Sequence, residues 1–486
     1  MAHRPRPPAT SYLHLAASSP PTDPTPRAKT LYHGSEAEIA ECVLDDLSLA
    51  LGELGVSGGA LRFWSGTYWG IVDDRFLQDT VLSYDAAEYP SGRFVRKVKM
   101  SNTKLVSLIK LVFKMAPRPA CFDKPAEGIP LLDAFLHIAD GRVVAAPHRP
   151  ENGNCSVIPA KWSNTVVGPP PENSLLHHFL GGLFKNDPED AQKLLLLSEI
   201  AGAALTGMGT RLSSPAAVIL LGETAANGKS QFLELLRGLV ADEAHVCLAP
   251  GDLENQRHLV QLAGKTLNAA DEISDRLVAS ERLKAAVTGE MVLACAIYEK
   301  ATWFRPIAQH VFTANALPTF LNGLDAGVLR RLKVLRFDRT IPPAERIPGI
   351  GRQIIEDELA LAVGWAISGA LRLSLQDRFT PLASNDRALK DMALQSNPVE
   401  AWLEAPEEVT ITGKPEHTLR TKDAYRAFKD WARKEGLRDI LLPTHTAFTQ
   451  AVKRIGAPKV RLKPTSPGNV FVGLVAGATK AESDRD

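Results

Sequence analysis

A glycine-rich turn between an apolar strand and an amphipathic helix holds the residues with the clearest chemistry. The segment AAVILLGETAANGKSQFLELLRGL contains Gly228, Lys229 and Ser230 in succession. In such a turn, backbone N–H groups and the helix N-terminus face a phosphate chain, the lysine reaches the β- and γ-phosphates, and the serine hydroxyl binds Mg²⁺. A Gly-Lys-Ser also arises by chance in chains of this length, but here the strand and helix that phosphate binding requires flank it. The sequence therefore predicts a phosphate-binding loop with ATP and Mg²⁺ as its ligands.

The loop departs by one residue from the usual spacing G-x-x-x-x-G-K. Glu223 occupies the position of the first glycine, and Gly222 precedes it. Either the loop is one residue longer than usual, or the first glycine is dispensable. The predicted nucleotide-binding residues are Gly222, Glu223, Thr224, Ala225, Ala226, Asn227, Gly228, Lys229 and Ser230.

Polar residues also follow or precede three later apolar segments. Asp271 and Glu272 come near the end of GKTLNAADEIS, where adjacent carboxylates suit a ligand of the metal or its water (Asp271) and a base that orients the attacking water (Glu272). Asn315 follows the strand HVFTA, where a neutral amide could hold the γ-phosphate or the water; a simple turn residue is an equal alternative. Arg330 and Arg331 precede the strand LKVLRF, a position that suits an arginine finger given to a neighbouring subunit. Such fingers accelerate hydrolysis by about 10³–10⁵.

A parallel sheet is the element that could bring these residues together. From the glycine-rich loop to about Phe337, short apolar strands alternate with helices, which is typical of a parallel α/β sheet. Ligands bind such sheets at the carboxyl ends of the strands. The loop, the carboxylate pair and the asparagine all lie at such ends.

The last 80 or so residues predict a separate module. NPVEAWLEA, TKDAYRAFKDWARKEG and THTAFTQAVKRIG are helical patterns, the last two opening after Thr421 and Thr444, and VRLKPTSPGNVFVGL predicts a hairpin. Three helices and a β-wing are typical of a winged helix-turn-helix. Every charged residue from Leu441 to Ala481 is basic, which favours phosphate contacts; a solvated face or a protein-docking surface is the alternative. The candidate DNA-binding residues here are Lys453, Arg454, Lys459, Arg461 and Lys463.

Composition limits the class of protein. A chain of 486 residues is too long for one hydrophobic core, so two to four domains are expected. The formal net charge of +1 excludes a nucleic-acid-coating protein and an acidic scaffold, so any nucleic-acid site is a local patch. The five cysteines are far apart with no C-x-x-C pair, which argues against a disulfide framework or cysteine-based zinc site and fits a reducing cytoplasm. The N-terminus has no apolar signal region, and the apolar stretch Leu359–Leu371 is too short to span a bilayer, so we expect a core helix there and no membrane partner.

With these motifs in order, the chain resembles the superfamily 3 DNA helicases, in particular the phage and plasmid primase–helicases and their poxvirus relatives. NGKSQF is similar to the family's first motif, AADEIS to its second, FTANALP to its third or sensor motif, and RRLKVLRF to its arginine-finger segment. Counting back from Phe337 favours Arg330 as the finger. The resemblance covers most of residues 31–475 and implies a ring, expected to be a hexamer, that moves along single-stranded DNA in the 3′-to-5′ direction.

Two further segments resemble the same family. LKAAVTGEMVLACAIYEKATWFRP is similar to its extra motif and central hairpin, which grips single-stranded DNA in the channel of the ring. This resemblance implies that Lys300 lies near the DNA backbone, supported by Lys284 and Arg305; a solvated loop lysine is the alternative for Lys300. IPLLDAFLHIADGRVVAAPHRPEN resembles the segment before the ATPase, with Asp133-Ala134-Phe135 where the family often has Asn-Gly-Val.

Many family members carry a polymerase-type primase domain with an Asp-x-Asp metal motif. Here the ordered region before the ATPase is short, and its acidic pairs, Asp45–Asp46 and Asp73–Asp74, are adjacent. Adjacent residues of a strand point to opposite faces, so neither pair converges on one metal. We expect no primer synthesis by this chain.

The expected fold class is an α/β P-loop (AAA+-like) ATPase core with an N-terminal α+β domain and a C-terminal winged helix-turn-helix domain. The expected boundaries are a disordered Pro-rich tail (1–30), the N-terminal domain (31–170), a helical collar (171–210), the ATPase (211–375), a linker (376–395), the winged helix (396–476) and a disordered tail (477–486).

The expected function is that of an ATP-dependent, ring-forming DNA helicase in phage, prophage or plasmid replication, in the bacterial host cytoplasm. Its expected partners are single-stranded DNA, origin or fork DNA, further copies of the chain and possible primase or polymerase proteins. The alternatives are a P-loop ATPase that loads or remodels other proteins, and a DNA-binding replication initiator for which the nucleotide is only a switch. A degenerate prophage remnant is disfavoured, because candidate residues are intact at every motif.

Overall fold

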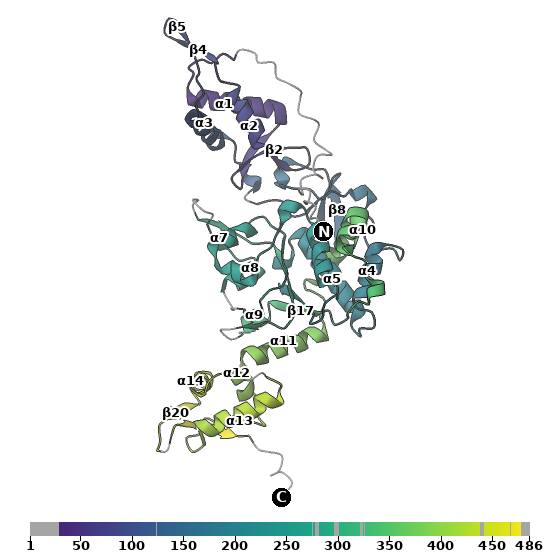
Figure 1. Ribbon diagram of the computed structural model, residues 1–486, viewed down its shortest axis with the longest axis vertical. Helices are drawn as coiled ribbons and strands as arrows, with labels where there is room; N and C mark the ends of the chain where they lie inside the picture. Colours follow the sequence, from purple (N-terminus) through teal and green to yellow (C-terminus); the bar gives the residue numbers. More distant parts are fainter. Residues whose placement is uncertain are drawn as a thin grey trace, which may run out of the picture. The chain divides into compact units, whose positions relative to one another are not determined.

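The chain divides into two units at Thr165, near the expected boundary at residue 170, and each unit is described by itself. The computed structural model describes residues 29–122, 124–274, 276–277, 281–295, 301–320, 324, 326–437, 442–466 and 468–477. Figure 1 shows both units coloured along the sequence.

Three helices and several small antiparallel sheets form the first unit. Helices α1 (Glu36–Leu51), α2 (Asp74–Leu82) and α3 (Asn102–Met115) pack against one another, and α1 also contacts a sheet of order β1-β2-β3 (Leu54–Ser57, Ala60–Trp64, Trp69–Ile71). Ser35 caps α1, because its Oγ accepts the Glu38 N–H at 3.2 Å. Strands β2 and β3 pair as an antiparallel hairpin. The remaining strands are the hairpin β4–β5 (Glu88–Ser91, Phe94–Lys97) and the sheet β6-β7-β8 (Ile129–Pro130, Phe135–Ala139, Arg142–Ala146).

The acidic residues of this unit have local structural contacts. Asp73 caps α2 by accepting the Phe76 N–H at 2.9 Å. Asp46 accepts the Tyr84 hydroxyl at 2.7 Å and pairs with Lys29. Both acidic pairs lie on helices, Asp45–Asp46 within α1 and Asp73–Asp74 at the start of α2, and not on strands as the sequence argument assumed.

A five-stranded parallel sheet is the centre of the second unit. Its order is β10 (His245–Val246), β11 (Leu267–Ala270), β15 (Gln309–Ala314), β9 (Ala217–Leu221) and β17 (Leu332–Arg336). Every residue of β9, β11 and β15 is buried. Strands buried in this way need cover on both faces, which explains their continuous apolar runs in the sequence.

Helices cover the two faces of this sheet. Helices α5 (Asp190–Thr206), α6 (Lys229–Leu239) and α10 (Ile350–Gln376) pack together, and α5 and α6 contact β15. Ala217, Ile219 and Leu221 point to the other face, where they share a hydrophobic cluster with Leu283 of α8 (Glu281–Thr288) and Met392 of α11 (Ala383–Ser396). Period-2 alternation along β9 thus divides its side chains between two apolar layers.

Helices α5 and α10 lie side by side at very short range (Figure 1). A Cβ on Gly369 would lie 1.9 Å from the Ser198 carbonyl oxygen, and one on Gly202 would lie 2.3 Å from the Ala370 nitrogen. In the described part of the chain, one helical segment, Pro343–Gln376, passes the length and composition test for a membrane span, and half of its apolar window is buried. Its packing against α5 agrees with the core helix expected at Leu359–Leu371.

The segment 376–395, expected to be a linker, instead contains most of the 14-residue helix α11, which packs against β17. The sequence FTPLASNDRALKD suggests a linker because it has no local capping residue that would signal the start of α11. The cap comes from Glu189, whose carboxylate accepts the Ala383 N–H at 2.6 Å and the Ser384 N–H at 3.2 Å. A cap supplied by a residue so distant in the sequence leaves no local signal.

The C-terminal module contains the three predicted helices and the predicted hairpin. The helices are α12 (Pro398–Leu403), α13 (Thr421–Lys434) and α14 (His445–Ile455), and β20 (Arg461–Lys463) pairs with β21 (Val470–Val472). The module also contains the short strands β18 (Val409–Ile411), β19 (Thr418–Arg420) and β22 (Leu474–Ala476). Strand β18 pairs with β22, and β19 pairs with β21. Trp402 and Phe428 pack on Phe448 in the core, with ring centroids 5.5 and 4.9 Å away. The winged helix-turn-helix assignment of this module stays a prediction.

A buried polar pair joins two central strands of the large sheet. Nδ2 of Asn268 on β11 lies 3.0 Å from Nδ1 of His310 on β15. The Asn268 side chain also accepts the Leu248 N–H and donates to the Leu248 oxygen. Because the amide donates to Nδ1, the imidazole proton belongs on Nε2. Burial of the ring lowers the pKa of His310 to about 4.

This shift predicts a pH dependence of stability. The unfolded chain protonates His310 near pH 6.5, while the folded protein resists protonation until about pH 4, so stability is lost as the pH falls through this window. The loss at the lower end is about 3 kcal/mol. Urea unfolding from pH 7 to pH 4.5 should show a shallower loss for His310→Gln than for the wild type. Identical pH slopes for the two proteins would contradict the prediction.

Candidate functional site

Three polar segments meet at the carboxyl edge of the five-stranded sheet. Gly222 follows β9, Asp271 follows β11 and Asn315 follows β15. Strand β15 lies between β11 and β9, and all three run parallel. The strand order therefore brings together residues that are far apart in the sequence, and Lys229 Nζ lies 3.4 Å from Asn315 Oδ1.

The loop from Gly222 to Ser230 folds around the lysine side chain. Lys229 Nζ donates to the Gly222 carbonyl oxygen at 2.6 Å, and Lys229 is only 6% exposed. Asn227 Nδ2 donates to the Thr224 oxygen at 2.5 Å, inside the same turn. The left-handed φ angles of Ala226 (57°) and Gly228 (92°) turn the chain into α6.

The close packing explains the unusual spacing of the glycines. A Cβ on Gly222 would lie 2.3 Å from Asn227 Nδ2 and 2.7 Å from Lys229 Nζ, so a side chain here would displace the ends of both. Glu223 is exposed, and its carboxylate lies 3.8 Å from Arg336 Nη2. Gly222 is therefore the glycine that leaves room for the lysine, and Glu223 is an additional, solvent-facing residue.

The N-terminus of α6 offers donors to an anion. Its N-cap residue is Gly228, which supplies no side-chain cap to the first turn. The first N–H groups of a helix have no partner within the helix, and the helix dipole favours a negative charge beside them. Ser230, in the first turn, is exposed. This end of α6 is chemically suited to phosphate oxygens.

Thr313, on the buried strand β15, fixes the geometry of the acidic pair. Its hydroxyl donates to Asp271 Oδ1 and accepts the Glu272 N–H at 2.8 Å, while its carbonyl oxygen accepts the Ile273 N–H at 2.9 Å. Glu272 has a φ of 49°, a left-handed conformation that a non-glycine residue adopts at a cost. Sequence reasoning missed Thr313, although it lies two residues before Asn315 and so on the same face of the strand.

The charges of the site act on one another. Burial lowers the pKa of Lys229, and the nearby carboxylates of Asp271 and Glu272 act in the opposite direction. Within the described residues there is no group of three or more His, Cys, Asp or Glu side chains that could hold a metal ion. One carboxylate, Asp271, and one hydroxyl, Ser230, nevertheless suit Mg²⁺, which keeps several waters and binds through one or two carboxylates together with substrate phosphates.

The segment that follows β17 is hydrogen-bonded to the loop from Gly222 to Ser230. Ile341 donates its N–H to the Ala226 oxygen at 2.9 Å, and the Thr340 hydroxyl donates to that of Thr224 at 2.9 Å. Leu183, at the end of α4 (Leu175–Leu183), packs so closely that a Cβ on Gly228 would lie 2.3 Å from its Cδ2. These contacts had no signal in the sequence, because they join segments more than 40 residues apart.

The structure does not bring Arg330 and Arg331 to the loop of their own chain. They precede β17, at the edge of the sheet opposite the loop, and β17 is five residues or roughly 16 Å long. Arg331 is half-buried and its Nη1 donates to the Gly327 oxygen at 2.7 Å. Arg330 is exposed.

The residues predicted to contact DNA are distributed over several elements. Lys300 lies outside the described residues, but the strands that flank it, β13 (Val292–Ala294) and β14 (Thr302–Phe304), form the expected antiparallel hairpin. Lys284 pairs with Glu281 at 2.8 Å, and Arg305 Nη1 donates to the Gly289 oxygen at 3.2 Å. The exposed basic residues at the end of α14 and around β20 are Lys453, Arg454, Lys459, Arg461 and Lys463.

Comparisons with known proteins give the following matches. A family model described as "Family of unknown function (DUF5906)" matches residues 220–331. No curated protein matches this chain. Among solved structures, the A form apo structure of the NrS-1 C-terminal region has a TM-score of 0.44 and 14% identity, over 81% of this chain and 96% of that one. Another apo structure of the same region has a TM-score of 0.43 and 14% identity, over 80% and 93% of the two chains.

The contacts of Thr313 predict a local effect of its removal. Thr313→Val keeps the shape of the side chain but leaves the Glu272 N–H without its acceptor, at a cost of about 1–3 kcal/mol. Hydrogen exchange at the Glu272 amide should then accelerate at least about tenfold, while Thr313→Ser, which keeps the hydroxyl, should exchange like the wild type. Equal exchange in the valine variant and the wild type would show that Thr313 does not hold the acidic pair.

Proposed function

We propose that this protein is an ATP- and Mg²⁺-dependent P-loop ATPase that works as a ring-forming DNA helicase in the replication of a phage, prophage or plasmid. The observation that carries the proposal is the meeting of Lys229, Asn315 and the Asp271–Glu272 pair at one edge of the parallel sheet. An ammonium, an amide and two carboxylates beside an uncapped helix N-terminus are the set of groups that hydrolysis of a phosphoanhydride needs.

Each residue has a role in the proposed reaction. Lys229 exchanges its bond to the Gly222 oxygen for the β- and γ-phosphates, and the N–H groups from Glu223 to Ser230 surround the phosphate chain. Ser230 and Asp271 would hold Mg²⁺, which neutralises charge on the phosphates. Glu272 orients and deprotonates the attacking water. Asn315, already in contact with Lys229, positions the γ-phosphate or the water without adding charge.

The arginine pair suits a site shared between subunits. Arg330 lies at the wrong edge of the sheet for its own loop, so it can act only on the nucleotide of a neighbouring copy. Arg330 is the better candidate for the finger, because it is exposed whereas the guanidinium of Arg331 is bonded to Gly327. This arrangement requires a homo-oligomer, proposed as a hexamer.

The DNA-binding part of the proposal concerns two regions. The β13–β14 hairpin is proposed to contact single-stranded DNA in the channel, through Lys300, which lies between the two strands in the sequence, and through Lys284 and Arg305. The C-terminal module is proposed to be a winged helix that contacts origin or fork DNA. In this role, the protein is proposed to work with a primase or polymerase partner in the cytoplasm of a bacterial host.

Two point variants test the hydrolytic site. Lys229→Ala should abolish ATP binding, whereas Glu272→Gln should bind ATP and hydrolyse it at least about 100-fold more slowly. Glu356→Gln is the matched control, since this exposed acid of α10 lies outside the loop, and it should stay close to the wild-type rate. Steady-state ATPase assays with and without single-stranded DNA provide the measurement, and DNA should stimulate the wild type several-fold.

The same assays separate the rival functions. Hydrolysis without DNA stimulation or strand separation would identify an ATPase that remodels proteins. Replication that survives the Glu272→Gln substitution would identify an initiator switched by nucleotide binding. Wild-type hydrolysis by Glu272→Gln would exclude the proposed site.

Mixed oligomers test the shared site. Lys229→Ala subunits keep Arg330, and Arg330→Ala subunits keep the loop, so a mixture should hydrolyse ATP faster than either variant alone. Mixing Lys229→Ala with Arg331→Ala gives the comparison that identifies the finger. No recovery in either mixture, with the proteins monomeric by light scattering, would contradict an inter-subunit site.

A further inference from the structure

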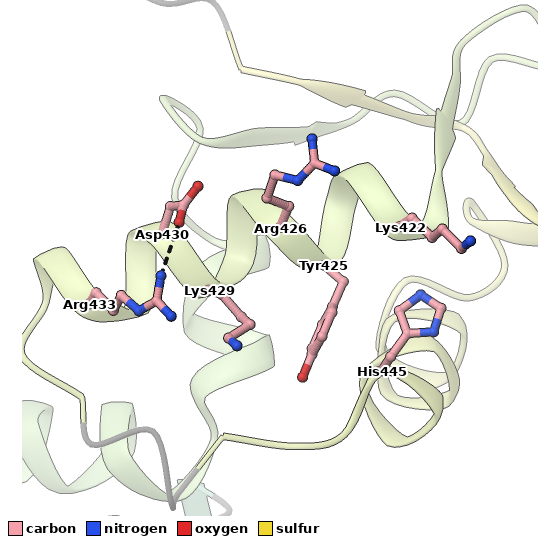
Figure 2. A pocket seen from close by; sticks show the side chains of 7 residues that line it. All are labelled: Lys422, Tyr425, Arg426, Lys429, Asp430, Arg433 and His445. Atoms are coloured by element: carbon pink, nitrogen blue, oxygen red, sulfur yellow. Dashed lines mark ion pairs between the residues drawn. The ribbon is translucent and has the colours of Figure 1, made fainter.

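The C-terminal module contains a hollow between two helices, and no lining residue of this hollow has a role assigned above. It has a volume of about 350 Å³ and lies along α13, with His445 from the start of α14 at its side (Figure 2). Four cationic residues follow one another along α13 in its lining: Lys422, Arg426, Lys429 and Arg433. We call this feature the α13 groove.

Packing of the hydrophobic core does not account for the cations of the α13 groove. Their spacing of four, three and four residues places them on one face of the helix. The opposite face buries Phe428, Trp431 and Ala432 in the core of the module. The apolar face alone fixes the helix in the fold, so the fold does not require positive charge on the other face.

The groove is strongly positive. Among the described residues that line it, Asp430 is the one carboxylate, and it pairs with Arg433 Nη1 at 3.5 Å (Figure 2). Four cations against one acid leave an excess of positive charge in a concave surface, which concentrates anions. The occupant must therefore carry several negative charges.

We propose that the α13 groove binds the phosphate backbone of duplex DNA. The cations extend over the twelve residues from Lys422 to Arg433, or roughly 16 Å of helix. Each strand of a duplex carries one phosphate per about 3.4 Å along the axis, so about five phosphates lie within reach. In a helix-turn-helix, the first of the two helices crosses the DNA backbone while the second enters the major groove. In the proposed winged helix, on which this inference rests, α13 is the first helix of such a pair and α14 is the second.

The aromatic residue of the groove argues against a single strand. Single-strand sites stack bases on aromatic side chains. Tyr425 has its hydroxyl bonded to the Pro443 oxygen at 2.9 Å, and its ring packs edge-on against His445 and close to Phe448. The Lys429 ammonium lies 6.0 Å from the centroid of the same ring. These contacts surround the ring, so the groove offers contacts to phosphates rather than to bases.

The α13 groove is separate from the basic residues that the sequence singled out. Lys459, Arg461 and Lys463 lie at the hairpin and do not line the groove. Sequence reasoning favoured them because no acid interrupts them, whereas Asp423 and Asp430 alternate with the cations of α13. Only in the folded helix does the 3.6-residue period bring the four cations together on one face.

A binding experiment with matched variants tests the proposal. The full-length protein without nucleotide is titrated against a short fluorescent duplex over a series of salt concentrations. The groove variant (Lys422→Gln, Arg426→Gln, Lys429→Gln) should bind at least about tenfold more weakly at low salt, and the slope of log K against log salt should fall by about 2 to 3. The control variant (Arg93→Gln, Arg96→Gln, Lys99→Gln), with three exposed cations of the first unit, should bind like the wild type.

A second variant separates binding from folding. Asp430→Asn removes the one carboxylate of the groove and should tighten duplex binding about threefold, a gain that a misfolded module cannot produce. Unchanged duplex affinity in both groove variants would overturn the proposal. So would an equal or larger loss for a single strand of the same length, or a loss of binding only to an acidic peptide.

The result does not depend on the proposed helicase activity. Duplex binding is measured without ATP, and basal ATP hydrolysis should be the same in the groove variant and the wild type. A protein that hydrolyses no ATP could still bind duplex through α13, and an active ATPase could lack this contact. Failure of one proposal is thus distinguishable from failure of the other.

Discussion

The pairing of β15 with both β11 and β9 is the constraint on which the rest of the second unit depends. Parallel hydrogen bonds in fixed register align Ala314 with Leu221 on one side and Phe312 with Ala270 on the other. The loops that follow these strands must then emerge at the same edge. A slip of one residue would reverse every side chain of β15, moving Thr313 away from the acidic pair and burying polar atoms in the apolar layer.

The loop around Lys229 is held in shape before any ligand binds. The lysine is bonded to Gly222 and Asn315, and the chain after β17 bonds the loop from the other side. Lys193, almost fully buried, pairs with Asp187 at 2.6 Å and donates to the Arg336 oxygen at 3.0 Å, which ties α5 to the same edge of the sheet. Because the groups of this site are already ordered, ligand binding costs little conformational entropy.

Distant carboxylates complete two helices of this unit. Glu189 caps α11, and Glu358 accepts the Leu175 and Leu176 N–H groups at 2.8 and 2.9 Å, which caps the start of α4. Glu358 itself has a non-helical φ of −130° within α10, so its backbone departs from helix geometry where its side chain reaches α4. The start of α4 also has a local cap, Ser174, whereas the start of α11 depends on the distant Glu189.

The sequence by itself determined the elements whose signals are local. Period-2 and period-3.6 patterns, the cap Thr444 and the Gly-Lys-Ser turn predicted the helices, the hairpins, the parallel sheet and the residues at the ends of its strands. Only the tertiary structure decided what depends on contacts between distant segments: Thr313 as the support of the acidic pair, a helix in place of the linker, and the opposite edge for Arg330. Local patterns act through neighbours in the chain, whereas strand order, register and long-range caps arise from packing that brings together residues tens to hundreds of positions apart.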